Sequence, residues 1–256
     1  MLLTERLNSG QASFTAWSGV PDPLTVEIVA RLGIEAVTLD MQHGGHHEDS
    51  VLRSIPAITG AGKHAIVRIP VGRFDMASRA LDFGAEAVIA PMINSVEDAR
   101  AFAASMKYPP VGGRSWGPTF GMPRSTARDA SEWLETQNKR TVSFAMIETR
   151  EAYAVADDII GVDGIDGIFV GPSDFSIGWT NGAAVNPVLE DIMAPIADIA
   201  AKARKAGKFA AIYLNDPAHA GRFAAMGYQI MALGNEQQYM RLGSDSLLNA
   251  ARATLA

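Results

Sequence analysis

The segment Val142-Ser-Phe-Ala-Met-Ile147-Glu148 decides the fold, because it is an apolar run of strand length that ends in a carboxylate. A second segment, Gly167-Ile-Phe-Val-Gly-Pro-Ser-Asp174, has the same form. Continuous apolar runs bounded by turn residues are typical of strands that are buried on both faces of a parallel sheet. If these strands are neighbours, Glu148 and Asp174 reach the same edge of the sheet. Two carboxylates repel each other there unless a cation lies between them, which indicates a divalent metal held by oxygen ligands.

The rest of the chain repeats this unit, since short β-rich runs alternate with longer helical patterns. The predicted strands are Phe14–Ser18, Ala36–Leu39, Ala65–Ile69, Ala87–Ala90, Val142–Ile147, Gly167–Val170, Phe209–Leu214 and Ile230–Leu233. The predicted helices lie near residues 22–32, 48–60, 74–83, 95–106, 150–160, 188–206, 216–226 and 236–254. Gly84 and Gly227 each follow a helical pattern and precede a strand, as glycine does at the C-terminus of a helix.

Eight strand–helix units in about 250 residues are typical of an α/β fold of the (β/α)₈ TIM barrel type. A doubly wound open sheet is the structural alternative, but no G-x-G-x-x-G follows the first strand. We therefore expect one barrel domain over residues 1–256. One long irregular connection, 107–141, contains a short helix around 129–138, and loops of this length are usually functional or interfacial.

Composition excludes several classes of protein and of site. The net charge of −6 gives no basic face for nucleic acid. Cysteine is absent, so a metal must be bound by carboxylate, carbonyl, imidazole or water. The charges at Glu5 and Arg6 come too early for a secretory signal, and no apolar run approaches the roughly 18 residues of a membrane span. We expect a cytoplasmic protein that binds neither nucleic acid nor membrane.

Polar residues gather at the predicted strand ends, where a barrel of this kind carries its active site. Singly, each has a structural interpretation, such as a capping carboxylate or a structural ion pair. Together they provide a base, a cation and two metal-type carboxylates at one rim. The residues at or just after the predicted strand ends are, in chain order, Trp17, Asp40, His43, Arg68, Pro91, Glu148, Ser173, Asp174, Asn215 and Asn235.

Other residues narrow the chemistry. His46 and His47 are expected to be solvated or to lie near a helix start. No lysine falls within or at the end of a predicted strand, which argues against a Schiff base, and no G-x-S-x-G elbow supports a serine hydrolase. With these two mechanisms disfavoured, we expect metal-assisted acid–base catalysis.

Five short motifs, in order between Trp17 and Gly234, resemble the HpcH/HpaI family of class II pyruvate-dependent aldolases. The resemblance implies a (β/α)₈ barrel, a Mg²⁺, Mn²⁺ or Co²⁺ ion, and reversible cleavage of 4-hydroxy-2-oxo acids to an aldehyde and pyruvate or a close analogue. It also implies a homohexamer, a trimer of dimers in which the last helix, 236–254, packs on a neighbouring barrel. The motifs are Asp40-Met-Gln-His43-Gly, Val67-Arg68-Ile-Pro, Ala90-Pro-Met-Ile93, Ile147-Glu148-Thr-Arg and Gly171-Pro-Ser-Asp174-Phe-Ser.

The resemblance also implies roles for these residues. Glu148 and Asp174 would ligate the metal, and His43 would be the general base. Arg68 would hold the 2-oxo oxygen and stabilise the enolate. Asp82, in Leu81-Asp-Phe-Gly84, matches a family carboxylate that raises the basicity of the histidine.

Further residues complete the predicted site. Asp40 is also expected to be a catalytic residue. Ser173 and Asp174, in a motif that begins with Gly171 and Pro172, would contact the substrate carboxylate through their backbone. Trp17 would line the aldehyde side.

The chain departs from the family pattern at two positions of the predicted site. Gln42 stands where the family usually has Glu, and Met146 stands where it usually has Gln. The first change removes a negative charge beside the base, and the second places a thioether in the substrate site. Phe175 and Trp179 also stand where smaller aliphatic residues are common. These departures bear on the identity of the substrate, usually a dicarboxylic acid, more than on the reaction type. They also make hydroxypyruvate a donor to test beside pyruvate.

Two alternative functions remain open at this stage. A lyase acting on a CoA thioester, in the manner of malyl-CoA lyase or citrate lyase β-subunits, would need a basic groove, for which Arg114 and Arg124 are the candidates. A non-catalytic carboxylate-binding barrel is the other alternative.

Overall fold

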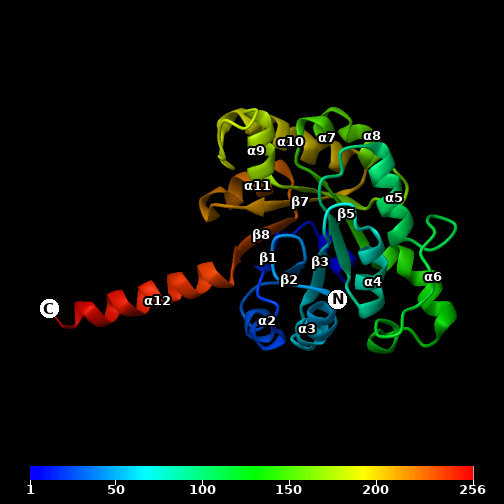
Figure 1. Cartoon of the computed structure of the whole chain (residues 1–256), viewed down its shortest axis with the longest axis horizontal. Coiled ribbons are helices and arrows are strands. Elements are labelled where there is room, and N and C mark those ends of the chain that lie inside the picture. Colours follow the sequence, from blue (N-terminus) through cyan, green and yellow to red (C-terminus); the bar gives the residue numbers. More distant parts are fainter. Residues whose placement is uncertain (256) are drawn as a thin grey trace.

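The computed structural model describes residues 1–255, and over that range it shows a closed barrel of eight parallel strands. Each strand pairs with the next one along the chain, and β8 pairs with β1. Helices surround this barrel (Figure 1), so the predicted (β/α)₈ TIM barrel is confirmed. The strands are β1 (Ser13–Ser18), β2 (Ala36–Asp40), β3 (His64–Arg68), β4 (Ala87–Ala90), β5 (Val142–Ile147), β6 (Gly167–Val170), β7 (Phe209–Leu214) and β8 (Ile230–Asn235).

Most predicted helices are present, and their ends differ from the prediction by a few residues. Gly84 and Gly227 end α4 and α11 in the left-handed conformation, with φ of 109° and 106°. The helices are α1 (Leu3–Asn8), α2 (Pro23–Ala30), α3 (Glu48–Gly60), α4 (Asp75–Phe83), α5 (Val96–Met106), α6 (Ala130–Arg140), α7 (Arg150–Ala154), α8 (Ala156–Ile160), α9 (Pro172–Trp179), α10 (Glu190–Lys205), α11 (Ala220–Met226) and α12 (Glu236–Ala253), with 3₁₀ turns η1 (Met122–Arg124) and η2 (Pro217–His219).

Three parts of the helix prediction were wrong. The helix expected over 150–160 is divided into α7 and α8 at Val155, whose φ of −115° and ψ of 21° interrupt the helical backbone. The helix expected over 216–226 opens with the 3₁₀ turn η2. Helices α1 and α9 were not predicted. In α9 the composition Gly171-Pro-Ser-Asp174 is that of a turn, but proline is also favoured at the first position of a helix.

The apolar core has two layers, as expected for a barrel with helices outside it. The inner layer fills the barrel with side chains such as Ile66, Phe144 and Phe169, each about 1% exposed. Leu3 and Leu7 of α1 belong to this inner layer, so α1 closes the N-terminal end of the barrel. The outer layer packs the other faces of the strands against the helices.

The strand register brings the predicted site residues to one level. Ile147 of β5 is paired with Val170 of β6, so Glu148 stands beside Gly171 at the start of the following helix. Asp40 is the register partner of Arg68 across β2 and β3. Neighbouring strand ends therefore deliver these groups side by side.

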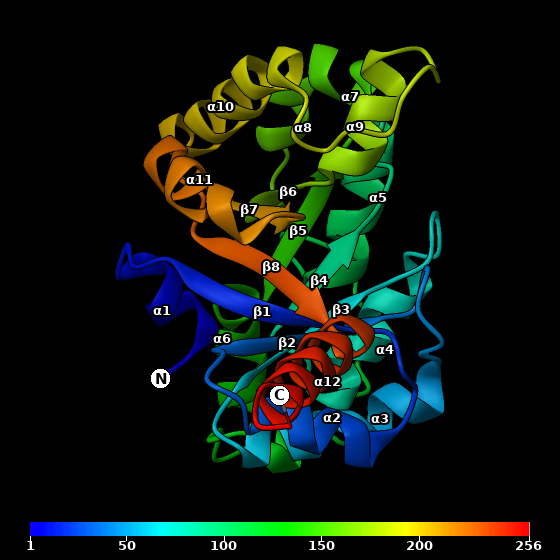
Figure 2. The same ribbon diagram turned by 90° about the vertical axis from the view of Figure 1, so that its left-hand side faces the viewer.

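Helix α12 departs from the barrel instead of packing on it (Figures 1 and 2). Of its residues only Glu236 is buried, whereas Met240 and Leu247 are 73% and 75% exposed. Within residues 1–255, no helix is both long and apolar enough to cross a membrane.

Candidate active site

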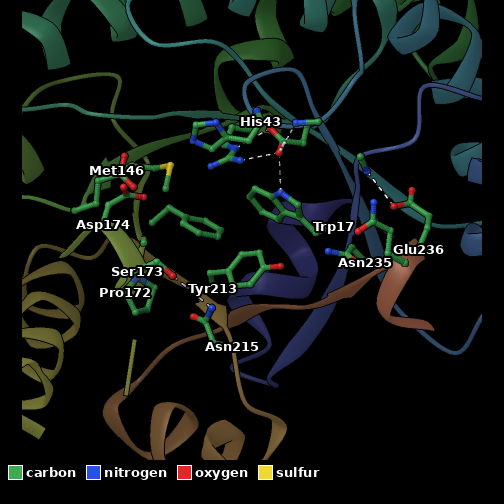
Figure 3. A pocket seen from close by; sticks show the side chains of 18 of the residues that line it. Trp17, His43, Met146, Pro172, Ser173, Asp174, Tyr213, Asn215, Asn235 and Glu236 are labelled. Atoms are coloured by element: carbon green, nitrogen blue, oxygen red, sulfur yellow. Dashed lines mark hydrogen bonds and ion pairs between the residues drawn. The ribbon is translucent and has the colours of Figure 1, made fainter. Parts of the chain in front are cut away.

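A cavity of about 490 Å³ opens at the C-terminal ends of the strands (Figure 3). The structure brings ten of the eleven predicted site residues to its wall, and Asp82 is the exception. Those ten are Trp17, Asp40, His43, Arg68, Met146, Glu148, Gly171, Pro172, Ser173 and Asp174.

Arg68 and Asp40 form a two-bonded ion pair in this wall. Arg68 Nε lies 2.8 Å from Asp40 Oδ1, and Nη2 lies 2.6 Å from Oδ2. Burial acts to raise the pKa of Asp40, but the hydrogen bonds and charge of Arg68 hold it below its ordinary value. Trp17 Nε1 donates to the same carboxylate at 3.1 Å, and the guanidinium lies 4.8 Å from the centre of the Trp17 ring. Asp40 thus fixes Arg68, whose Nη1 donates to no residue within 1–255.

His43 lies on the loop that follows β2, and its side chain reaches the cavity. The Asp40 carboxylate shapes this loop by accepting from the backbone N–H groups of Gln42, His43 and Gly44, at 3.0, 3.4 and 3.1 Å. Gly44 is required here, because a Cβ at this position would lie 2.5 Å from the Asp40 carbonyl oxygen. The Gln42 amide nitrogen lies 3.2 Å from His43 Nε2, so the imidazole has a neutral neighbour.

Glu148 is 2% exposed and has a strongly shifted pKa. Burial, followed by the negative charge of Asp174, raises the pKa of Glu148 from 4.5 to about 7, against the hydrogen bond from Met92. The Met92 N–H donates to Glu148 Oε1 at 2.8 Å from a backbone with φ of 53°. A non-glycine residue in this left-handed region is strained, and such strain is concentrated at functional sites.

The pair formed by Glu148 and Asp174 fits a divalent cation. Both provide oxygen ligands, and a cation between them would offset the burial of Glu148 and its repulsion from Asp174, which raise the Glu148 pKa. Within residues 1–255, no group of three or more His, Cys, Asp or Glu gathers to hold an ion. A metal at this pair would therefore take its other ligands from water or from a bound molecule.

Gly171 and the start of α9 form the adjacent wall. A Cβ on Gly171 would lie 2.4 Å from Glu148 Oε2 and 3.2 Å from Met146 Cε, so only glycine leaves both side chains in place. Pro172, Ser173 and Asp174 form the first turn of α9, where backbone N–H groups have no partner within the helix. The N-terminus of a helix attracts anions such as a carboxylate.

A buried polar network, which the sequence did not predict, lies behind Glu236 in the wall. Ser18 Oγ donates to Glu236 Oε1 at 2.5 Å and lies 2.9 Å from His46 Nε2. His46 is 4% exposed and therefore not solvated, but it lies near the start of α3, which was the other expectation. The preceding Gly44-Gly45 segment turns the chain inward, and His46 Nδ1 lies 3.1 Å from Ser50 Oγ. His47 is exposed and precedes α3, as expected.

This arrangement supplies an anion-binding helix start, a fixed guanidinium, an imidazole and a carboxylate pair around one space. The family model described as HpcH/HpaI aldolase/citrate lyase matches residues 14–241. The chain belongs to this family. The match confirms the membership that the five motifs predicted, and it makes the protein a carbon–carbon lyase of the aldolase type.

Similar proteins cover almost the whole chain. A hydroxypyruvate/pyruvate aldolase from Rhizorhabdus wittichii is 32% identical over 246 residues, which are 96% of each chain. A 4-hydroxy-2-oxo-heptane-1,7-dioate aldolase from Salmonella typhimurium is 29% identical over 95% of this chain and 91% of its own. The crystal structure of an HpcH/HpaI aldolase from Desulfitobacterium hafniense has a TM-score of 0.88 and 23% identity, covering 98% of this chain and 97% of that one.

Three charged residues named from the sequence of this aldolase lie outside the cavity. Asp82 is bound to Arg114 at 2.6 Å, and burial raises the pKa of Asp82 in spite of that ion pair. It makes no hydrogen bond to the His43 of its own chain within residues 1–255. Arg124 donates to the carbonyl oxygen of Phe83 at 3.0 Å. Neither arginine lines the cavity, so neither provides the basic groove that a CoA thioester would need.

Proposed function

We propose that this aldolase reversibly cleaves 4-hydroxy-2-oxo acids into an aldehyde and pyruvate or hydroxypyruvate, with Mg²⁺, Mn²⁺ or Co²⁺ as cofactor. The observation that carries the proposal is the meeting of Arg68 with the Glu148–Asp174 pair at one cavity. Aldol cleavage develops negative charge on the 2-oxo oxygen, which Arg68 and a metal held by the two carboxylates would stabilise. The names of the relatives, a hydroxypyruvate/pyruvate aldolase among them, support the same substrate class.

Glu148 and Asp174 would hold the metal, whose charge would polarise the 2-oxo group of the bound acid. The backbone N–H groups of Ser173 and Asp174 would receive the substrate carboxylate at the start of α9. Arg68 Nη1, left free by the ion pair with Asp40, would donate to the 2-oxo oxygen. Such a preorganised donor contributes several kcal/mol when charge develops on the oxygen it faces.

His43 would act as the general base. It would take the proton of the C4 hydroxyl while the C3–C4 bond breaks. The C4 oxygen then becomes the aldehyde carbonyl, and the bonding electron pair moves into the enolate held by Arg68. Protonation at C3 yields the 2-oxo acid product. We therefore expect His43→Ala to abolish aldol turnover without loss of metal binding.

The groups next to Glu148 and Asp174 would determine which 2-oxo acid serves as the donor in the aldol reaction. Met146 is 2% exposed and lines the cavity beside Gly171, where its thioether offers an apolar contact. Gln42 removes a negative charge next to His43. Both differences favour testing hydroxypyruvate beside pyruvate as the donor, and Trp17 would separate the donor from the aldehyde.

We also propose a cytoplasmic homohexamer, a trimer of dimers in which α12 packs on the barrel of a neighbouring copy. The exposed apolar residues of α12 support an exchanged helix. Leu24 and Ile28 on α2, 70% and 67% exposed, offer an apolar surface on the barrel. Because Asp82 lies outside its own cavity, a role for it at His43 would require a neighbouring copy. Light scattering of the full chain measures the assembly.

Isotope exchange tests the proposed function directly. The protein should exchange the C3 protons of pyruvate with deuterium when Mn²⁺ is present, stop after EDTA, and recover on adding Mn²⁺. A carboxylate-binding protein without catalytic activity would show no exchange. Cleavage of malyl-CoA in preference to free 4-hydroxy-2-oxo acids would replace the proposal with the CoA-thioester lyase.

A further inference from the structure

The cavity has a polar wall that runs from Ser173 to the side away from the metal-type carboxylates. Figure 3 shows Asn235 and Glu236 beside Trp17, across the cavity from Met146 and Asp174. Five residues from the ends of β7 and β8 form this wall. They are Tyr213, Asn215, Asn235, Glu236 and Gln237.

Glu236 is a buried acceptor in this wall that is rigidly held. It is 4% exposed, and both of its carboxylate oxygens are fixed. Oε1 accepts from Ser18 Oγ at 2.5 Å, and Oε2 accepts from the Gly19 N–H at 3.0 Å. Each oxygen keeps a further lone pair that can accept a hydrogen bond.

A buried hydrogen-bond network behind Glu236 holds its carboxyl group in place. Burial lowers the pKa of His46 to about 4, so its ring is neutral at pH 7 and carries one N–H. His46 Nε2 lies 2.9 Å from Ser18 Oγ, and His46 Nδ1 lies 3.1 Å from Ser50 Oγ. The neutral imidazole therefore places no positive charge beside Ser18 and Glu236.

The wall around Glu236 offers no free cation within residues 1–255. Glu236 makes no ion pair there, and Arg68 is the only Lys or Arg in the cavity wall. Asp40 already neutralises Arg68. An aldehyde substrate that ends in a carboxylate would therefore place that carboxylate next to Glu236, with no cation to pair with it. The cost of removing the substrate carboxylate from water would not be offset.

The amides in the same wall suit hydroxyl groups. Asn235 Oδ1 is used to cap α12, since it accepts from the Gln238 N–H at 3.0 Å, which leaves its amide nitrogen as a donor. Asn215 adds a second, exposed amide next to Ser173, at 3.5 Å. A hydroxyl both donates and accepts, so it pairs with an amide and with Glu236 together. An apolar aldehyde would leave these groups unpaired.

We propose that this wall selects a neutral, hydroxylated aldehyde and rejects aldehydes that end in a carboxylate. The inference rests on the proposed function and narrows its aldehyde half. It separates this aldolase from a relative named for a dicarboxylic substrate. Glu236 disfavours a terminal carboxylate on the aldehyde. Glu236, Asn215 and Asn235 together bind its hydroxyl groups.

Aldol addition to pyruvate with Mn²⁺ tests the selection in the wild-type protein. We expect kcat/KM for glyceraldehyde to exceed that for propanal and for succinic semialdehyde by about tenfold or more, because a site built to bond a hydroxyl discriminates strongly against analogues that lack it. Succinic semialdehyde equal to or better than glyceraldehyde would overturn the inference. A preference for the cationic 3-aminopropanal would also overturn it.

Variants assign the effect to the wall. Glu236→Gln should raise kcat/KM for succinic semialdehyde relative to glyceraldehyde by about tenfold. Asn215→Leu, at an exposed loop position, should lower the ratio of glyceraldehyde to propanal, and it tests the wall even if Glu236→Gln fails to fold. Glu97→Gln removes a matched, 81% exposed carboxylate from α5 and should leave all ratios unchanged. Unchanged ratios in Asn215→Leu would overturn the inference.

Deuterium exchange into pyruvate without any aldehyde separates the two proposals. Exchange combined with an inverted aldehyde preference would overturn only the assignment of the polar wall. Absence of exchange in the metal-loaded wild type would overturn the proposed function and this inference with it.

Discussion

Glu148→Gln should stabilise the metal-free protein at alkaline pH, although Glu148 is a proposed metal ligand. The buried carboxyl group has a pKa raised from 4.5 to about 7 by burial and by Asp174. A raised carboxyl pKa means that folding favours the protonated form. Its contribution to stability is fully present below pH 4.5 and is lost as the pH rises through 7. Glutamine keeps an oxygen for the Met92 N–H and carries no charge at any pH.

The expected magnitude follows from the pKa change. Raising the pKa from 4.5 to about 7 corresponds to about 3 kcal/mol at about 1.4 kcal/mol per pH unit. At pH 8 the variant should therefore gain about 3 kcal/mol in the free energy of unfolding, relative to wild type in EDTA. At pH 5, where most of the wild-type carboxyl is protonated when folded, the gain should fall below about 1 kcal/mol.

Urea unfolding in EDTA at pH 5 and pH 8 measures both values. Added Mn²⁺ should stabilise the wild type by mass action at pH 8 and should stabilise the variant much less. Glu97→Gln is the control for the loss of one charge and should behave as wild type. If Glu148→Gln is less stable than wild type at pH 8, or if its gain does not depend on pH, the assigned cost of the buried charge is refuted.

Three further substitutions test other parts of the site. Arg68→Lys keeps the charge but loses the planar two-bonded geometry. It should lower kcat/KM for cleavage about 100-fold, with metal affinity unchanged by calorimetry. Gln42→Glu places a carboxylate beside His43 and favours its protonated form, so the acid limb of the kcat/KM–pH profile should move to higher pH. An unmoved limb would remove His43 as the base. Gly171→Ala puts a Cβ 2.4 Å from Glu148 Oε2. It should weaken Mn²⁺ binding at least about tenfold while the circular dichroism spectrum stays that of the folded protein.

The strands and the rim were predictable because the information is local. An apolar run that ends in a carboxylate, such as the one before Glu148, shows both that a strand exists and where it ends. Parallel strands then place their ends at one edge, so Asp40, Arg68 and Asp174 followed from the same reasoning. The motifs added the family to which these residues belong.

The sequence placed Asn215 and Asn235 at the rim, but the Ser18–Glu236 contact and the burial of His46 were not predictable, because their causes are remote in sequence. Ser18 and Glu236 are 218 positions apart, and no local pattern announces that they touch. His46 is buried only because the Gly44-Gly45 turn brings it to Ser18. Helix α9 was missed for a different reason, since Gly-Pro-Ser-Asp is as compatible with a turn as with the first turn of a helix.

Glu236 is both a wall of the cavity and the first residue of α12. The carboxylate that faces the aldehyde is thus attached to the helix that leaves the barrel with its apolar side chains exposed. A partner that binds α12 also fixes the position of the backbone that carries the Glu236 side chain. If copies associate through α12 as proposed, their association and the choice of aldehyde are linked. Dilution that releases α12 should then lower the aldehyde selectivity, while Glu148 after β5 and Asp174 on α9 keep their places.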